Sequence, residues 1–174
     1  MAHSAFQSFI MGPHLVRELM TVGVPTCKLD TPVIDIARYL LENNVEGMCV
    51  LDKEGNGVGV VGIEELAVAY SQQNACSITA EDVMREGMPT LKADMPLALA
   101  AQMMCDQHTR IAYMIHNAAG IIYPAAYITY RHLVRHLAAE SGDELKDLGI
   151  KAERKNPLQV FVEKRDAARR LAQT

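Results

Sequence analysis

The residue types most able to do chemistry gather near position 130. A hydroxyl and four basic side chains fall within eight positions: Thr129, Arg131, His132, Arg135 and His136. They stand at the expected start of a helix, where free backbone N–H groups and the helix dipole favour an anion. The cluster therefore indicates a phosphate-binding site. The alternative is a helix that exposes its basic residues to water, and the residues alone leave both interpretations open.

Two of these residues also have the spacing of a helical metal site. His132 and His136 are four positions apart, which places both imidazoles on one helix face. Neither a third ligand nor a zinc-protease glutamate accompanies them, so a solvated pair is the preferred interpretation. The pattern offers no nucleophile with a base and no paired catalytic carboxylates, since Asp30 and Asp94 are better explained as helix caps. The sequence therefore predicts no metal site and no enzymatic activity.

The composition is that of an ordinary globular protein. Apolar residues make up 49% and charged residues 22% of the 174 positions, which argues against disorder. The net charge of −4 argues against a nonspecific nucleic-acid binder, which needs clustered cations. The chain has no apolar run that could span a membrane and begins with no secretion signal, so a cytoplasmic location is expected. The four cysteines form no Cys-x-x-Cys pair, and we expect small buried residues.

The elements that would position the basic cluster occur twice. Sliding the chain along itself by 64 positions brings similar motifs together, and a fixed period indicates one structural unit used twice. The matched motifs are Leu19-Met20 with Val83-Met84, Gly23-Val24-Pro25-Thr26 with Gly87-Met88-Pro89-Thr90, and Asp30-Thr31-Pro32 with Asp94-Met95-Pro96. The offset grows to 67 at the closing helix, so we expect a bulge inserted into the second copy around Tyr123-Pro124.

Each copy predicts the same series of elements. A short helical turn ends at Met20 or Met84, and an extended segment follows. The next helix has apolar residues at helical spacing: Val33, Ile36, Ala37, Leu40 and Leu41 in copy one, and Leu97, Ala100, Ala101 and Met104 in copy two. A strand, a turn and a second strand then lead to a closing helix. Periodicity therefore predicts an α/β (α+β) fold made of a duplicated unit.

The order and the motifs of the two copies resemble the CBS domain pair. Leu19-Met20 and Val83-Met84 are similar to the Val-Met opening of that family, and Val50-Leu51-Asp52-Lys53-Glu54-Gly55 is similar to its Val-Val-Asp-x-x-Gly hairpin. The resemblance implies small mixed sheets flanked by helices, with a pseudo-twofold axis between the repeats. We divide the chain into an N-terminal apolar extension (1–12), repeat 1 (13–76), repeat 2 (77–141) and a helical C-terminal tail (142–174).

The resemblance also implies ligands such as AMP, ADP or ATP, held without a covalent bond in clefts between the repeats. Nucleotide-binding members end their last strand in Gly-x-x-Thr-x-x-Asp. Aligned with this pattern, copy one keeps an acid at Glu65 and loses the threonine, whereas copy two keeps Thr129 and loses the acid. The expected ligand-binding residues are Val24, Thr26, Cys27, Met88 and Thr90 around the base, and Glu65, Thr129, Arg131 and His132 near the ribose and phosphate.

Two functions are consistent with this resemblance. The first is a stand-alone regulatory module that binds an adenosine nucleotide and signals to a partner protein. The alternative is a structural dimerisation module whose clefts are filled by its own side chains, and Tyr113, Tyr127 and Tyr130 are bulky enough to do so. Because family members frequently pair as flat dimers, we expect a homodimer through the helices, with neither a membrane nor a nucleic acid as partner.

Overall fold

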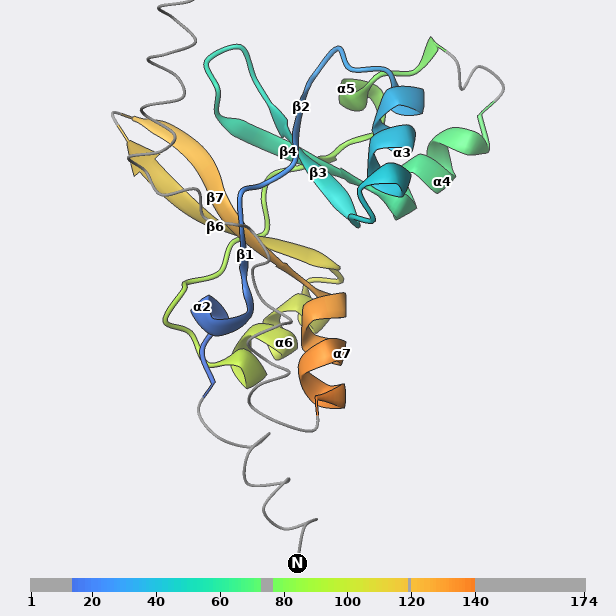
Figure 1. Ribbon diagram of the computed structural model, residues 1–174. Helices are drawn as coiled ribbons and strands as arrows, with labels where there is room; N and C mark the ends of the chain where they lie inside the picture. Colours follow the sequence, from blue (N-terminus) through green and yellow to red (C-terminus); the bar gives the residue numbers. More distant parts are fainter. Residues whose placement is uncertain (1–13, 73–76, 119, 140–174) are drawn as a thin grey trace, which may run out of the picture.

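The structure consists of two α/β repeats (Figure 1). It is a computed structural model that describes residues 14–72, 77–118 and 120–139. The first repeat contains α2 (Val16–Leu19), β1 (Thr21–Val22), β2 (Thr26–Lys28), α3 (Val33–Glu42), β3 (Gly47–Leu51), β4 (Gly57–Gly62) and α4 (Ile63–Tyr70). The second contains α5 (Ala80–Val83), β5 (Arg85–Glu86), α6 (Leu97–Asp106), β6 (Ile111–Ala118), β7 (Ile121–Thr129) and α7 (Tyr130–Ala138).

Each repeat contributes its first short strand to the sheet of the other. Strand β1 pairs antiparallel with β7 in a sheet of order β1-β7-β6, and β5 pairs antiparallel with β4 in a sheet of order β2-β3-β4-β5. Thr21 lies opposite Tyr127, and Arg85 lies opposite Val60. Thr21 and Arg85 are 64 positions apart, so equivalent residues make equivalent pairs. The register thus confirms the pseudo-twofold relation and ties the repeats together.

The extra residues of the second repeat lengthen its hairpin. The register shifts between Val50 and Leu51 in the first repeat and between Met114 and Ile115 in the second, which are equivalent places. The predicted bulge beside Pro124 is therefore present, at Ala125, but the first repeat carries an equivalent one at Val58, so the bulge is not the insertion that lengthens the second copy. The difference lies farther out, where residues 116–118 pair with residues 121–123 before a turn at Gly120.

Helices α3 and α6 confirm the predicted helical periodicity. They bury Val33, Ile36 and Leu40 in the first repeat, and Leu97, Ala100 and Met104 in the second. Leu41, which the same pattern placed on the buried face, is 83% exposed. Pro32 and Pro96 precede the two helices, and neither helix has a side-chain cap. The prediction that Asp30 and Asp94 cap them is therefore wrong.

A third apolar cluster lies between the two sheets and joins the repeats. Its buried members are Cys49, Val60, Ile111, Tyr113 and Tyr127, and Val24, Leu51 and Met88 pack against them. Two further clusters fill the space between a sheet and its helices, and a small fourth one, Val33, Ala69 and Ile78, contains no strand residue. The cleft described below has this inter-sheet cluster as its floor.

The structure bears on two expectations from composition, the burial of the cysteines and the lack of a membrane-spanning segment. Cys27 and Cys49 are buried as expected, whereas Cys105 is exposed, so the prediction is wrong for Cys105. Cys76, residues 1–12 and residues 142–174 lie outside the described residues. Within the described ranges, none of the helices has the length and apolar character needed to cross a bilayer.

Candidate functional site

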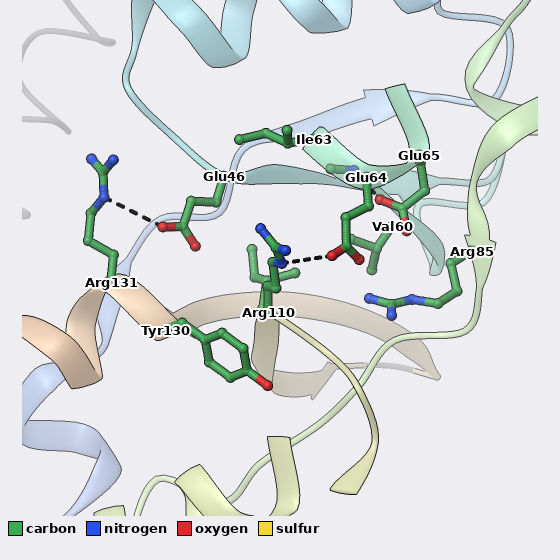
Figure 2. Close-up of a pocket in the computed structure, with 11 residues that line it drawn as sticks. Glu46, Val60, Ile63, Glu64, Glu65, Arg85, Arg110, Tyr130 and Arg131 are labelled. Atoms are coloured by element: carbon green, nitrogen blue, oxygen red, sulfur yellow. Dashed lines mark hydrogen bonds and ion pairs between the residues drawn. The ribbon is translucent and has the colours of Figure 1, made fainter. Parts of the chain in front are cut away.

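A cleft of about 160 Å³ lies between the two repeats, where helices α4 and α7 begin. Gly62 and Ile63 bring the first turn of α4 to its wall, and Tyr130 does the same for α7. Val60 and Ile111 belong both to the lining of the cleft and to the cluster between the sheets. Six charged residues complete the lining: Glu46, Glu64, Glu65, Arg85, Arg110 and Arg131 (Figure 2).

Two ion pairs cross the cleft from one repeat to the other. Arg110 Nε lies 2.8 Å from Glu64 Oε1, and Arg131 Nε lies 3.5 Å from Glu46 Oε1 (Figure 2). The Arg110 and Glu64 side chains are 59% and 51% exposed. Exposed pairs of this kind contribute about 0–1 kcal/mol. The pairs therefore hold the cleft closed only weakly and can be exchanged for a ligand at small cost.

The two ion pairs are equivalent under the pseudo-twofold relation, with their charges exchanged. Glu46 corresponds to Arg110 by the offset of 64, and Glu64 corresponds to Arg131 by the offset of 67. The first repeat thus supplies the acid of each pair and the second repeat the base. Sequence reasoning missed Glu46, Glu64, Arg85 and Arg110. Applying the two offsets to Glu46 and Glu64 would have shown that their equivalents in the second repeat, Arg110 and Arg131, carry the opposite charge.

Two of the predicted ligand-binding residues line this cleft. Glu65 Oε2 accepts the Gly62 backbone N–H at 2.8 Å, so its carboxylate satisfies the free N-terminus of α4. Arg131 Nη1 donates to Asn44 Oδ1 at 2.8 Å while its Nε faces Glu46. The structure thus brings together the retained acid of copy one and a cation of copy two.

Thr129 and His132 are not part of the lining of the cleft and bond to each other. Thr129 is 2% exposed, and its backbone N–H donates to Nδ1 of His132 at 3.1 Å. On the other side of the ring, Nε2 of His132 lies 2.9 Å from Thr21 Oγ1. Burial, followed by the charges of Arg135 and Arg131, lowers the pKa of His132 to about 4. A neutral His132 thus caps α7 and ties it to strand β1.

The five residues expected around the base lie outside the lining of the cleft. Val24 and Met88 pack against the inter-sheet cluster. Thr26 pairs with Cys49 in the register of β2 and β3. Cys27 is buried in the core of the first repeat, and this burial raises its pKa to about 11. Thr90 is exposed, so the structure separates this set from Glu65 and Arg131.

The second histidine of the helical pair has a different environment from the first. His136 is 9% exposed, and its ring lies edge-to-face against His14 with centroids 4.9 Å apart. The predicted solvated pair is therefore wrong for both histidines, because His14 packs against His136 and His132 bonds through both of its ring nitrogens. Among the described residues, no group of three or more His, Cys, Asp or Glu side chains could hold a metal ion.

The three tyrosines proposed to fill the clefts take two positions. Tyr113 is fully buried and Tyr127 is 8% exposed, and both pack between the sheets. Tyr130 lines the cleft, and its hydroxyl donates to the Met104 carbonyl at 3.2 Å. Tyr113 and Tyr127 thus fill the space between the sheets, but the tyrosines do not fill the charged cleft.

Comparisons with known proteins agree with this architecture. The CBS domain family model matches residues 16–72. The CBS domain pair of protein MJ0100, in complex with 5′-methylthioadenosine and S-adenosyl-L-methionine, is 19% identical with a TM-score of 0.64, over 74% of this chain and 98% of that one. CBSX2 in complex with AMP is 22% identical with a TM-score of 0.58, over 72% and 96% of the two chains.

A third solved structure extends the likeness. The CBS-domain containing protein ATU1752 from Agrobacterium tumefaciens is 16% identical with a TM-score of 0.64, over 73% of this chain and 96% of that one. A comparison with curated proteins finds no match. At these identities the solved structures establish the fold, and the family model identifies the first repeat. Residues 16–72 of the chain are therefore a CBS domain, and the chain has the fold of a CBS domain pair.

Proposed function

We propose that this protein is a regulatory module that binds an adenosine-type ligand in the cleft between its repeats. The observation that carries the proposal is the cleft itself, where the first turns of α4 and α7 meet beside Arg110 and Arg131. Helix N-termini and guanidinium groups together favour an anionic group. Two solved CBS proteins of this fold are in complex with adenosine compounds, AMP in one and 5′-methylthioadenosine with S-adenosyl-L-methionine in the other, which supports an adenosine-type ligand here.

The ligand's position follows from the chemistry of the walls. An anionic group would pair with Arg110 and Arg131, which would release Glu64 and Glu46. The base would lie against the apolar floor formed by Val60 and Ile111, which belong to the cluster that Val24 and Met88 pack against. Glu65 would face the ribose, as the family pattern implies.

The size of the cleft links binding to a change in shape. Pockets for drug-sized ligands measure roughly 300–1,000 Å³, and this cleft measures about 160 Å³. A whole adenosine ligand therefore requires the repeats to separate or their ion pairs to break. A ligand that binds only the opened arrangement shifts the population toward it. A partner protein that distinguishes the two arrangements would receive this signal.

A thermal-shift series tests the proposal. AMP, ADP, ATP, S-adenosyl-L-methionine and 5′-methylthioadenosine are titrated against the purified protein. A ligand at a hundredfold excess over its Kd should add about 2.7 kcal/mol of stability. Arg131→Gln should abolish the shift, whereas the control Arg38→Gln should preserve it. Arg38 is a matched control because it also forms an ion pair, with Asp35 on α3, but does not line the cleft. A flat response of the wild type to every compound would contradict the proposal.

A structural role in dimerisation is the second candidate. Exposed apolar side chains on three helices favour it: Leu41 on α3, Val68 on α4, and Val134 and Leu137 on α7, each at least 60% exposed. Apolar surface of this extent is typical of interaction sites. We propose that these helices pair two copies of the chain as a homodimer, which is compatible with ligand binding in the cleft.

A further inference from the structure

The hairpin of the second repeat has an outer part that exposes apolar side chains on both faces. Beyond the bulge, residues 115–118 of β6 pair with residues 121–124 of β7. Ile115, Ile121, Ile122 and Tyr123 are 41–45% exposed there. Because partners across a ladder point to the same face, Ile115 and Ile122 lie on one face of the hairpin, and Ile121 and Tyr123 lie on the other. Exposed apolar surface of this kind indicates an interaction site.

The first repeat satisfies one edge of this outer hairpin. On the β7 side, the backbone N–H of Ile122 donates to Asn56 Oδ1 at 3.0 Å. Because this N–H points away from β6, Ile122 and its partner Asn117 form a pair without mutual hydrogen bonds. The N–H and C=O groups of Asn117 therefore point to the opposite edge of the hairpin, and those of Ile115, two positions earlier on the strand, do the same.

The opposite edge, formed by β6, is open beyond Tyr113. Tyr113 still has partners there, because its N–H donates to the Pro89 carbonyl at 2.8 Å and its carbonyl accepts the Leu91 N–H at 2.9 Å. Within the described residues, the outward groups of Ile115 and Asn117 have no backbone partner. Edge strands are commonly protected by lysine or proline, and Ile115-His116-Asn117 contains neither. Such an edge can bind an extended segment as an additional strand.

The chain itself contains a segment with the pattern that this edge requires. Leu158-Gln159-Val160-Phe161-Val162-Glu163 follows Pro157 in the sequence and lies outside the described residues. Its β-branched and aromatic residues favour a strand, and proline is tolerated where a strand begins. In extended form, Leu158 and both valines share one face and Phe161 lies on the other. The segment can therefore cover the apolar side chains on both faces of the outer hairpin.

The connection to this segment is long enough to reach the open edge. The described part of the chain ends at Ala139, after β7 and α7 of nine residues each. At rises of about 3.3 Å and 1.5 Å per residue, these two elements place Ala139 within about 45 Å of the outer hairpin. The intervening residues 140–157 extend to about 60 Å at about 3.3 Å each. The segment can thus pair with β6 of its own chain.

We infer that residues 158–163 pair with the open edge of β6 as a fourth strand of the β1-β7-β6 sheet, with the valines beside Ile115 and Phe161 beside His116. This strand replaces the helix expected over the same residues of the C-terminal tail. It joins the tail to the sheet that both repeats build, because β1 belongs to the first repeat. The outer hairpin does not line the cleft, so the inference is independent of the proposed function.

Amide hydrogen exchange of the full chain, followed by NMR, tests this pairing. We expect the Ile115 and Asn117 amides to exchange about tenfold more slowly in the wild type than in the double variant Val160→Pro/Phe161→Pro, as a docked fraction of about nine-tenths provides. Successive residues of a strand direct their N–H groups to opposite edges, so two adjacent prolines remove a ladder bond in any register. The control Leu171→Pro/Ala172→Pro makes the same change beyond the segment and should keep the slow exchange.

The other outcomes overturn the inference in distinguishable ways. Fast exchange of both amides in the wild type would show that the edge is open in solution. Slow exchange that the Val160→Pro/Phe161→Pro variant retains would show that something other than residues 158–163 covers the edge. Slow exchange that disappears on dilution would assign the cover to a second copy of the chain. Loss of protection in the control variant as well would remove the assignment to this segment.

Discussion

Acidification should weaken the junction between α7 and β1 by protonating His132. Nδ1 of the ring accepts the Thr129 N–H, so the neutral ring carries its proton on Nε2 and donates it to Thr21 Oγ1. A second proton, on Nδ1, would place the Nδ1–H of His132 against the backbone N–H of Thr129, and two donors cannot form a hydrogen bond. Burial and the neighbouring Arg135 and Arg131 add to this and lower the pKa of His132 to about 4 from its ordinary value of 6.5.

The sign and size of the effect follow from that shift. The unfolded chain binds this proton near pH 6.5 and the folded protein only near pH 4, so the unfolded state holds more protons between these values. The free energy of unfolding therefore falls as the pH falls through this window. Since one pKa unit corresponds to 1.36 kcal/mol, the contribution of His132 is at most about 3 kcal/mol.

Urea denaturation followed by circular dichroism between pH 7 and pH 4 measures this contribution. The matched variant is His132→Asp, because an acid at the third helical residue can accept the same backbone N–H, as Asp82 does from Thr79 at 2.8 Å. His136, whose pKa burial also lowers, remains in both proteins and cancels in the difference. The wild type should lose about 3 kcal/mol more than the variant over this range. Equal losses would refute the assignment of a neutral, capping His132.

Three further substitutions test the packing and the assembly. Tyr113→Phe should stabilise the fold by about 1 kcal/mol in a thermal melt, because its buried hydroxyl has no partner among the described residues. Gly59→Ala should cost about 2 kcal/mol or more in the same assay, because the new Cβ would lie 2.9 Å from the Arg85 carbonyl and disturb the exchanged strand. Leu137→Lys should convert the proposed homodimer to a monomer in sedimentation velocity, and a dimer of unchanged stability would exclude α7 from the interface.

Local patterns were sufficient to predict the repeats and most of their helices. The offset of 64 arises from short motifs such as Gly23-Val24-Pro25 and Gly87-Met88-Pro89, in which both glycines have a positive φ that other residues rarely adopt. The spacing of apolar residues likewise predicted the buried face of α3 and α6. These features depend on residues close together in the chain, and sequence periodicity reports such contacts directly.

The errors concern contacts between distant segments. The spacing that predicted the buried face of α3 also included Leu41, because periodicity cannot tell how wide a stripe the sheet covers. Thr129 and His132 have residue types suited to a phosphate. In the structure, however, Nε2 of His132 is bonded to Thr21 of the exchanged strand β1. Strand exchange between repeats is a nonlocal pairing, and neither the motif nor its spacing contains that information.

The charge exchange between the repeats explains why the cleft is one composite site. If both repeats carried the acids of the first, Glu46 would face a glutamate at position 131, and Glu64 would face a glutamate at position 110. Both cross-cleft contacts would then join like charges, which repel at 2.8–3.5 Å. An acid in one repeat is therefore compatible with this closed cleft only when its equivalent in the other repeat is a base. A single ligand bound across such a cleft meets two different walls, so the pseudo-twofold axis that generates the fold does not generate two equal sites there.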